Sequence, residues 1–137
     1  MLPTQCLCTK LRRASRGVSK LYDDALAGVG LTVAQYSLLK NLQRLEQPSI
    51  TCLAQAVGLE RSTLGRNLRL LENKGLVVLE GGEDQRNRLV LLTAEGDKCL
   101  ERGLQAWQQA QEQLASRLGP EQKAALMTML DQLETLD

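Results

Sequence analysis

The segment from Arg61 to Leu71 combines three arginines with other hydrogen-bonding side chains and contains no acidic residue. An arginine can bind guanine O6/N7 or a phosphate, an asparagine can read adenine, and a serine or threonine can contact either. The candidate set is Arg61, Ser62, Thr63, Arg66, Asn67 and Arg69. A solvated amphipathic helix would also be polar on one side, but it would not need an excess of one charge. The composition and the order of the neighbouring elements favour DNA contact over simple solvation.

A second charged segment, GGEDQRNRLVLL at 81–92, runs into an unbroken apolar stretch. Glycines and charges ahead of such a stretch are typical of a hairpin loop. An arginine at the tip of a hairpin can enter a narrow minor groove, where the potential is most negative. Asp84 can hold the guanidinium of Arg86 by a bidentate ion pair. We therefore predict that Asp84, Arg86 and Arg88 belong to a DNA-binding surface, a role that a merely soluble loop does not require.

Cysteine chemistry offers a separate possibility near the N-terminus, where the sequence reads Cys6-Leu7-Cys8. Paired thiolates bind soft ions such as arsenite or Cu(I), and the nearby Arg12 and Arg13 can lower the pKa of a thiol. Residues i and i+2 of a helix point about 200° apart, so one chain could chelate an ion only if this end is extended. The alternative is that the two cysteines are small packed apolar residues. Cys6 and Cys8 are thus a candidate thiol sensor, with packing as the rival explanation.

Enzyme chemistry is not indicated. The chain has no histidine, so it lacks an imidazole base and a histidine metal ligand. It also contains no glycine-rich phosphate loop and no HExxH-type motif, so we predict no catalytic residue, no metal site and no cofactor. There is no apolar run of about 18 residues to span a membrane and no secretory signal. Four cysteines in 137 residues are too few for a disulfide scaffold, which indicates a cytoplasmic protein with reduced thiols.

Hydrophobic periodicity predicts the elements that must position these side chains. Helices are expected over 4–28, 33–46, 50–57, 61–74, 94–118 and from Pro120 onward, and strands over 76–80 and 88–92. Thr32, Ser49 and Thr93 are suitable N-cap residues, and Gly75 is a natural residue to end the helix before it. The first helix has an apolar face at Leu7, Leu11, Ala14, Val18, Leu21 and Ala25.

The element order of short helix, tight turn, second helix and hairpin predicts a mainly α fold with a small β-hairpin wing, a winged helix-turn-helix. Its second helix is built to enter the major groove of DNA. We assign 31–93 to a DNA-binding lobe, and 1–30 and 94–137 to a helical dimerisation region, within one integrated domain. The heptad-like seam from Leu100 to Leu118 and the apolar stripe from Leu126 to Leu136 exceed what a small lobe can cover, so we expect a homodimer.

The distribution of charge is uneven although the net charge is only +1. Residues 1–30 hold five basic and two acidic side chains, a balance of +3, whereas residues 93–137 hold four basic and eight acidic ones, a balance of −4. The N-terminal part could therefore face an anion, and the C-terminal part could not.

At these positions the chain resembles the MarR family of bacterial transcriptional regulators. The matching segments are LAQAVGLERSTLGRNLRLLENKGLV (53–77) and the wing DQRNR (84–88). The resemblance implies a cytoplasmic homodimer with interlocked first and last helices that binds near-palindromic double-stranded promoter DNA, usually as a repressor. It also implies release by a small-molecule inducer or by thiol oxidation.

Carried over residue by residue, the resemblance places Ser62, Thr63 and Arg66 in the recognition helix, and Asp84 and Arg86 in the wing. Two positions depart from the family pattern. Glu60 stands where a small helix-capping residue is common, and Arg69 stands where an acid is common. The second departure adds positive charge, and both leave the base preference open.

A protein of another class is also compatible with this element order. A winged helix can serve as a protein-interaction or dimerisation adaptor without binding DNA, because a fold alone does not decide the function. Salt separates the two readings: a nucleic-acid binder loses affinity steeply as salt rises, whereas an adaptor built on a leucine seam does so only slightly.

Overall fold

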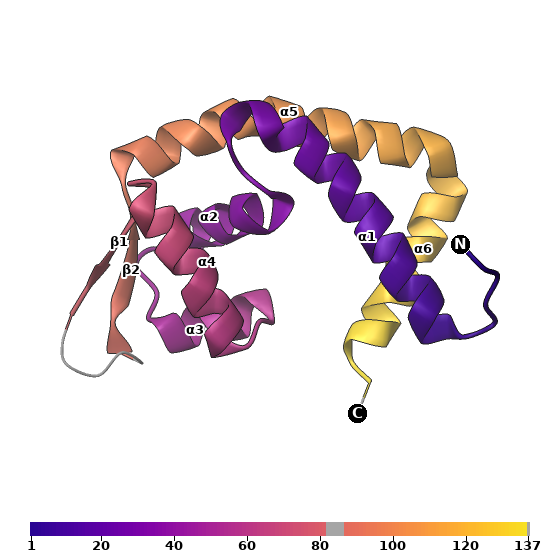
Figure 1. The fold of residues 1–137 in the computed structure, drawn as a ribbon, viewed down its shortest axis with the longest axis horizontal. Coiled ribbons are helices and arrows are strands. Elements are labelled where there is room, and N and C mark those ends of the chain that lie inside the picture. The colour runs from indigo at the N-terminus through magenta and orange to yellow at the C-terminus, as the bar shows by residue number, and fades with distance from the viewer. Residues whose placement is uncertain (82–86, 137) are drawn as a thin grey trace.

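The computed structural model describes residues 1–81 and 87–136. Its elements follow in the order α1 (Leu7–Leu26), the short 3-10 helix η1 (Ala27–Val29), α2 (Val33–Leu45), α3 (Ile50–Val57), α4 (Arg61–Asn73), β1 (Val77–Glu80), β2 (Leu89–Leu92), α5 (Ala94–Leu118) and α6 (Pro120–Glu134). Figure 1 shows α5 along the top of the molecule, with α2, α3, α4 and the hairpin below one end and α6 at the other. We call α2, α3, α4, β1 and β2 the winged lobe, and α1, α5 and α6 the helical frame.

The helices of the winged lobe begin at the capping residues that the sequence predicts. The Thr32 hydroxyl accepts a hydrogen bond from Gln35 N at 3.2 Å, and the Gln35 side chain accepts one from Thr32 N at 3.1 Å, which completes a capping box. The Ser49 hydroxyl accepts a hydrogen bond from Cys52 N at 3.1 Å. After α4, Gly75 has a φ of 76°, a left-handed conformation that glycine adopts without strain. These local predictions are confirmed.

The core of the winged lobe lies between its three helices and the hairpin. α4 buries Leu64, Leu68 and Leu71, as its three- and four-residue spacing predicts. They join buried leucines of α2 and α3 and the strand residues Val77 and Val90 in one apolar cluster. Because this cluster takes the apolar side of α4, the polar side of the helix is left at the surface.

The hairpin is fastened to the helix-turn-helix by backbone hydrogen bonds. β1 and β2 are antiparallel, with Val77 opposite Leu92 and Glu80 opposite Leu89, so each strand is one residue shorter than predicted. On its other edge β2 pairs with the segment before α3, where Ile50 N donates to Arg88 O at 3.1 Å and Val90 N donates to Pro48 O at 2.9 Å. This pairing fixes the position of the hairpin beside α4.

Within the single chain, α5 buries a stripe that is distinct from the predicted leucine seam. Leu100 is buried, but Leu104 is 39% exposed, and the buried stripe of α5 continues instead through Gly103 and Ala110. A side chain at Gly103 would place its Cβ 3.0 Å from the Tyr36 ring. A Cβ there would require the ring to shift by a few tenths of an ångström, and small residues bring α5 close to the rest of the chain.

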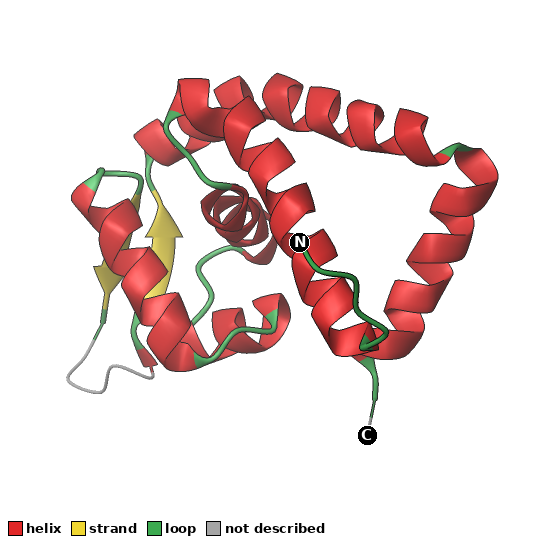
Figure 2. Cartoon of the chain, turned by 45° about the vertical axis from the view of Figure 1, so that its right-hand side comes forward, coloured by secondary structure: helices red, strands yellow, loops and turns green. Residues whose placement is uncertain are grey.

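The outer part of the frame is apolar and exposed in the single chain. α1 begins at Leu7 rather than at residue 4, and Leu7 is 79% exposed. No described residue of α6 is buried, and Leu133 is 43% exposed. Figures 1 and 2 agree that the C-terminal end of α6 approaches the N-terminal end of α1, on the far side of the frame from the winged lobe. Among the described helices, none is long and apolar enough to cross a membrane.

Candidate DNA-binding interface

α4 presents the predicted polar residues on the side away from its buried leucines. Arg61, Ser62, Arg66 and Arg69 are exposed, whereas Thr63 and Asn67 are half-buried. Arg66 Nη2 lies 3.4 Å from the Thr63 hydroxyl, to which it donates a hydrogen bond. The structure thus brings the six residues onto one helix, with three guanidinium groups at the surface and two neutral side chains closer to the core.

A groove of about 380 Å³ separates α4 from the hairpin. Its lining consists of Ile50, Arg61, Ser62, Gly65, Arg66, Leu68, Arg69, Glu72, Leu79 and Arg88. Four arginines from two elements therefore surround one depression, and Glu72 is the one acidic residue among the lining residues. Thr63 and Asn67 are not in this lining.

Arg88 directly precedes β2, at the base of the loop and next to the Glu80–Leu89 strand pair. Its side chain is half-buried, and Nη2 lies 3.4 Å from the carbonyl oxygen of Leu79 on the opposite strand, to which it donates. The structure therefore brings Arg88 together with the arginines of α4. The predicted wing residues Asp84 and Arg86 lie outside the described residues.

In the part of the chain that the structure describes, no carboxylate forms an ion pair with an arginine of α4. Within residues 1–81 and 87–136, ion pairs join Lys20 to Asp24 and Lys98 to Glu95, and none includes an arginine of α4. Glu60 occupies the N-cap of α4, but its side chain makes no capping hydrogen bond. The guanidinium groups and the first amide groups of α4 are therefore open to an anion such as a phosphate.

Sequence reasoning missed several residues that shape the groove. Ile50 and Leu79 form part of its lining, and Glu72 places a carboxylate there. Ile50 reaches this position through the pairing of the segment before α3 with β2. In the sequence, the proline at 48 indicates only a break between helices. It gives no signal that the segment around it forms backbone hydrogen bonds with β2.

The candidate thiols lie on the helical frame, at the end of α1 opposite to the winged lobe (Figure 1). Cys6 and Cys8 are both exposed. Cys6 is the N-cap residue of α1 and has an extended backbone, whereas Cys8 is in the first turn of the helix. A hydrogen bond with the Thr9 side chain, supported by backbone hydrogen bonds, lowers the pKa of the Cys6 thiol. Nothing buries the pair, so its role as a sensor stays a prediction.

The other two cysteines occupy different environments. Cys52 is exposed on α3, and Cys99 is buried with its thiol 3.7 Å from the carbonyl oxygen of Val29. Within the described part of the chain, no three cysteine, aspartate or glutamate side chains are close enough together to hold a metal ion.

Comparison with known proteins agrees with this geometry. The MarR family model matches residues 29–87. Over 103 residues the chain is 32% identical to the transcriptional regulator HosA of Escherichia coli. The aligned region covers 73% of this chain and 75% of HosA.

Two solved structures of regulators are also similar. MosR of M. tuberculosis in complex with DNA has a TM-score of 0.78 at 31% sequence identity. The match covers 96% of this chain and 100% of the MosR chain. The repressor CouR bound to p-coumaroyl-CoA has a TM-score of 0.86 at 27% sequence identity. The match covers 97% of this chain and 94% of the CouR chain. These proteins confirm the predicted winged-helix fold and a regulator rather than an enzyme. The chain belongs to the MarR family of DNA-binding transcriptional regulators.

Proposed function

We propose that the protein is a cytoplasmic repressor that binds a near-palindromic DNA site as a homodimer and inserts α4 into the major groove. The observation that carries the proposal is a groove whose lining contains four arginines and one acidic residue, Glu72, beside the exposed side of α4. When a recognition helix lies in the major groove of DNA and a hairpin lies beside it, the phosphate backbone contacts both the helix and the hairpin.

The side chains of α4 have separate roles in this proposal. Arg66 is exposed in the middle of the second turn and reads a base edge, while Ser62, Thr63 and Asn67 add contacts that depend on the sequence. Arg61 and Arg69, together with Arg88 across the groove, bind phosphates and fix the register. Asp84 and Arg86 keep the minor-groove role that the sequence assigns to them.

Dimerisation is proposed for the helical frame, and DNA binding for the winged lobe, which corresponds to the division at residues 30 and 94. The exposed apolar side chains of Leu7 on α1, Leu133 on α6 and Leu136 just after α6 support it, because a single chain gains nothing from exposing large apolar residues there. Symmetric pairing of the frames would place the two α4 helices about 34 Å apart, one turn of DNA.

Release by a small molecule is proposed for the junction between the frame and the lobe. The Tyr36 hydroxyl is buried there without a hydrogen-bond partner among the described residues, and the Tyr36 ring is stacked on Trp107 with ring centroids 6.3 Å apart. A stacked aromatic pair and an unpartnered hydroxyl together offer apolar contact and one hydrogen bond to an apolar ligand that carries one polar group. The similar repressor CouR has been solved with p-coumaroyl-CoA bound, which supports an organic ligand. Oxidation of Cys6 and Cys8 is the alternative trigger.

Recovery of bound fragments from random DNA tests the proposal directly. The expected result is one near-palindromic sequence whose half-sites lie about one helical turn apart. Arg66→Ala should relax the preference at particular base pairs and cost about 1–3 kcal/mol of binding free energy. Arg44→Ala is the matched control, because Arg44 is exposed on α2 and bonds Asn41 at 2.8 Å instead of lining the groove. Recovery of no enriched sequence by the parent protein would contradict the proposal.

The alternative function, a protein-interaction adaptor, predicts a different dependence of binding on salt. An adaptor would retain its partner as salt rises, whereas a protein that neutralises several phosphates loses a factor of about 10³ or more in affinity between 50 and 200 mM salt. A flat salt dependence of DNA binding by the parent protein would favour the adaptor.

A further inference from the structure

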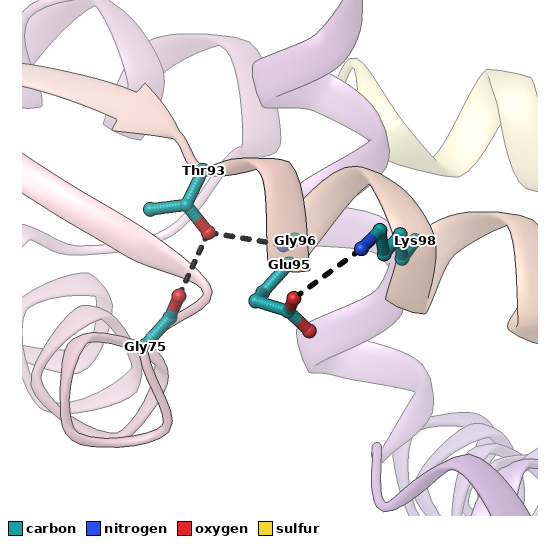
Figure 3. Close-up of polar contacts among 5 residues, drawn as sticks. All are labelled: Gly75, Thr93, Glu95, Gly96 and Lys98. Atoms are coloured by element: carbon teal, nitrogen blue, oxygen red, sulfur yellow. Dashed lines mark hydrogen bonds and ion pairs between the residues drawn. The ribbon is translucent and has the colours of Figure 1, made fainter.

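The end of α4 and the beginning of α5 meet at one threonine. Thr93 N donates to Leu76 O at 3.1 Å, and the Thr93 hydroxyl donates to Gly75 O at 2.7 Å. The same hydroxyl accepts a hydrogen bond from Gly96 N at 3.0 Å, as Figure 3 shows. One side chain thus joins the residue that ends the recognition helix to the first turn of the longest frame helix.

The backbone of α5 also touches the chain that leaves α4. Gly96 is buried, and a Cβ at this position would lie 2.6 Å from Leu92 Cδ1 and closer still to the carbonyl oxygen of Leu76. That carbonyl is the one that accepts from Thr93 N. Only glycine permits this approach, so the start of α5 rests directly on the backbone between α4 and β1.

A further hydrogen bond ties the end of α4 to the other side of the frame. Lys74 Nζ donates to the carbonyl oxygen of Gly30 at 2.7 Å, in the connection between α1 and α2. Next to it, the Cys99 thiol of α5 lies 3.7 Å from Val29 O. The end of α4 is therefore held against both α5 and the α1–α2 connection, which leaves it little freedom to rotate independently of the frame.

We infer that Thr93 and Gly96 are positioning residues that fix the angle of α4 on the frame and thereby set the spacing between half-sites that the dimer accepts. The inference rests on the proposed function, since it needs a dimer that binds two half-sites. α4 has 13 residues, which makes it about 20 Å long. A tilt of about 10° about its C-terminal end moves its N-terminal end by about 3–4 Å in each protomer, which is about one base pair at about 3.4 Å each, so the spacing that a symmetric dimer accepts changes by about two base pairs.

Binding to a series of spacers tests the inference. The two half-sites recovered with the parent protein are placed in a series of DNA duplexes, in which the spacer between the half-sites changes by one base pair at a time. The affinity of each duplex is measured for the parent, Thr93→Val, Thr93→Ser and Gly96→Ala. Valine keeps the shape of threonine but removes both hydrogen bonds of the hydroxyl, whereas serine keeps them. Gly96→Ala separates α5 from the Leu76 carbonyl by steric contact.

Thr32→Val is the matched control for the loss of a helix cap. Thr32 is also an N-cap threonine, but its hydroxyl bonds Gln35 within the same helix and joins no second element. Helix content by circular dichroism and thermal midpoints are recorded for every variant. Both variants lose one cap hydrogen bond, and Thr93→Val loses in addition the bond to Gly75 O, so a difference between their spacer profiles reflects the junction and not the cap.

The expected result is that the parent, Thr93→Ser and Thr32→Val share one sharp optimum, with affinity falling more than about tenfold one base pair away. Thr93→Val should flatten this profile to within about threefold over two base pairs, and Gly96→Ala should move or flatten it. An unchanged optimum in both variants, with the parent profile sharp, would overturn the inference. A parent protein that recovers no half-sites would instead overturn the proposed function.

Discussion

Truncation of the exposed leucines of the frame should weaken the proposed dimer by an amount that follows from their exposure. Burying a leucine side chain completely is worth about 1.5–3 kcal/mol. Leu7 is 79% exposed in the single chain, so complete coverage by a partner is worth about 1.2–2.4 kcal/mol at that residue. A symmetric dimer contains the residue twice, which gives about 2.4–4.7 kcal/mol for Leu7→Ala as an upper estimate. This corresponds to a dimer dissociation constant about 50- to 3000-fold weaker.

Truncation of Leu133 on α6 should also weaken the dimer, but by less than truncation of Leu7. It is 43% exposed, so Leu133→Ala should cost about 1.3–2.6 kcal/mol per dimer, or about 10- to 80-fold in the dissociation constant. Sedimentation equilibrium over a range of concentrations measures both variants. Leu70→Ala is the control, since Leu70 is 51% exposed but lies on α4 in the winged lobe. The reasoning is refuted if Leu7→Ala and Leu133→Ala leave the dissociation constant unchanged, or if Leu70→Ala changes it as much.

Three further predictions concern the core and the thiols. Tyr36→Phe removes a buried hydroxyl that lacks a partner among the described residues, so it should raise the free energy of unfolding in urea by about 1–3 kcal/mol; a lower value would mean that the hydroxyl is bonded. Leu68→Ala should lower the same free energy by about 2–5 kcal/mol, because Leu68 is 2% exposed in the core of the lobe; a change under about 0.5 kcal/mol would be inconsistent with that burial. Thr9→Val removes the hydrogen bond that lowers the pKa of Cys6, so that pKa should rise, the thiolate fraction at neutral pH should fall, and alkylation followed by mass spectrometry should slow. Buried Cys99 should stay unlabelled in the native protein, and equal rates for Cys6 in parent and variant would argue against the role of Thr9.

The winged lobe could be predicted from the sequence because its determinants are local. The spacing of Leu64, Leu68 and Leu71 fixes which side of α4 is buried, and it thereby places Arg61 and Arg66 at the surface. Cap residues next to apolar runs define where helices begin. A recognition helix therefore follows from residues within a few turns of one another.

The packing of the frame could not be predicted in the same way. A seam based on large apolar residues omits Gly103 and Ala110, which are buried within the single chain. Close approach of α5 depends on the Tyr36 ring, a residue about 70 positions away in sequence. Hydrophobic periodicity does not identify small residues that allow such contact.

The groove beside α4 is also a product of long-range pairing. Its wall includes Ile50 and Leu79, which approach α4 because β2 pairs with both β1 and the chain before α3. The charged loop predicts DNA contact for Arg88, and the structure places its side chain at the base of that loop, bonded to Leu79 O on the opposite strand. The contribution of each arginine to DNA binding stays a prediction.

Affinity for the recovered site relative to a scrambled duplex of equal length and composition tests the central claim most directly. At fixed salt near the physiological level, a sequence-specific regulator should bind its site at least about 10³-fold more tightly than the scrambled duplex. Arg66→Ala should reduce that ratio by about 5- to 150-fold, in line with about 1–3 kcal/mol, and Arg44→Ala should leave it unchanged. A ratio near one for the parent protein would contradict the account.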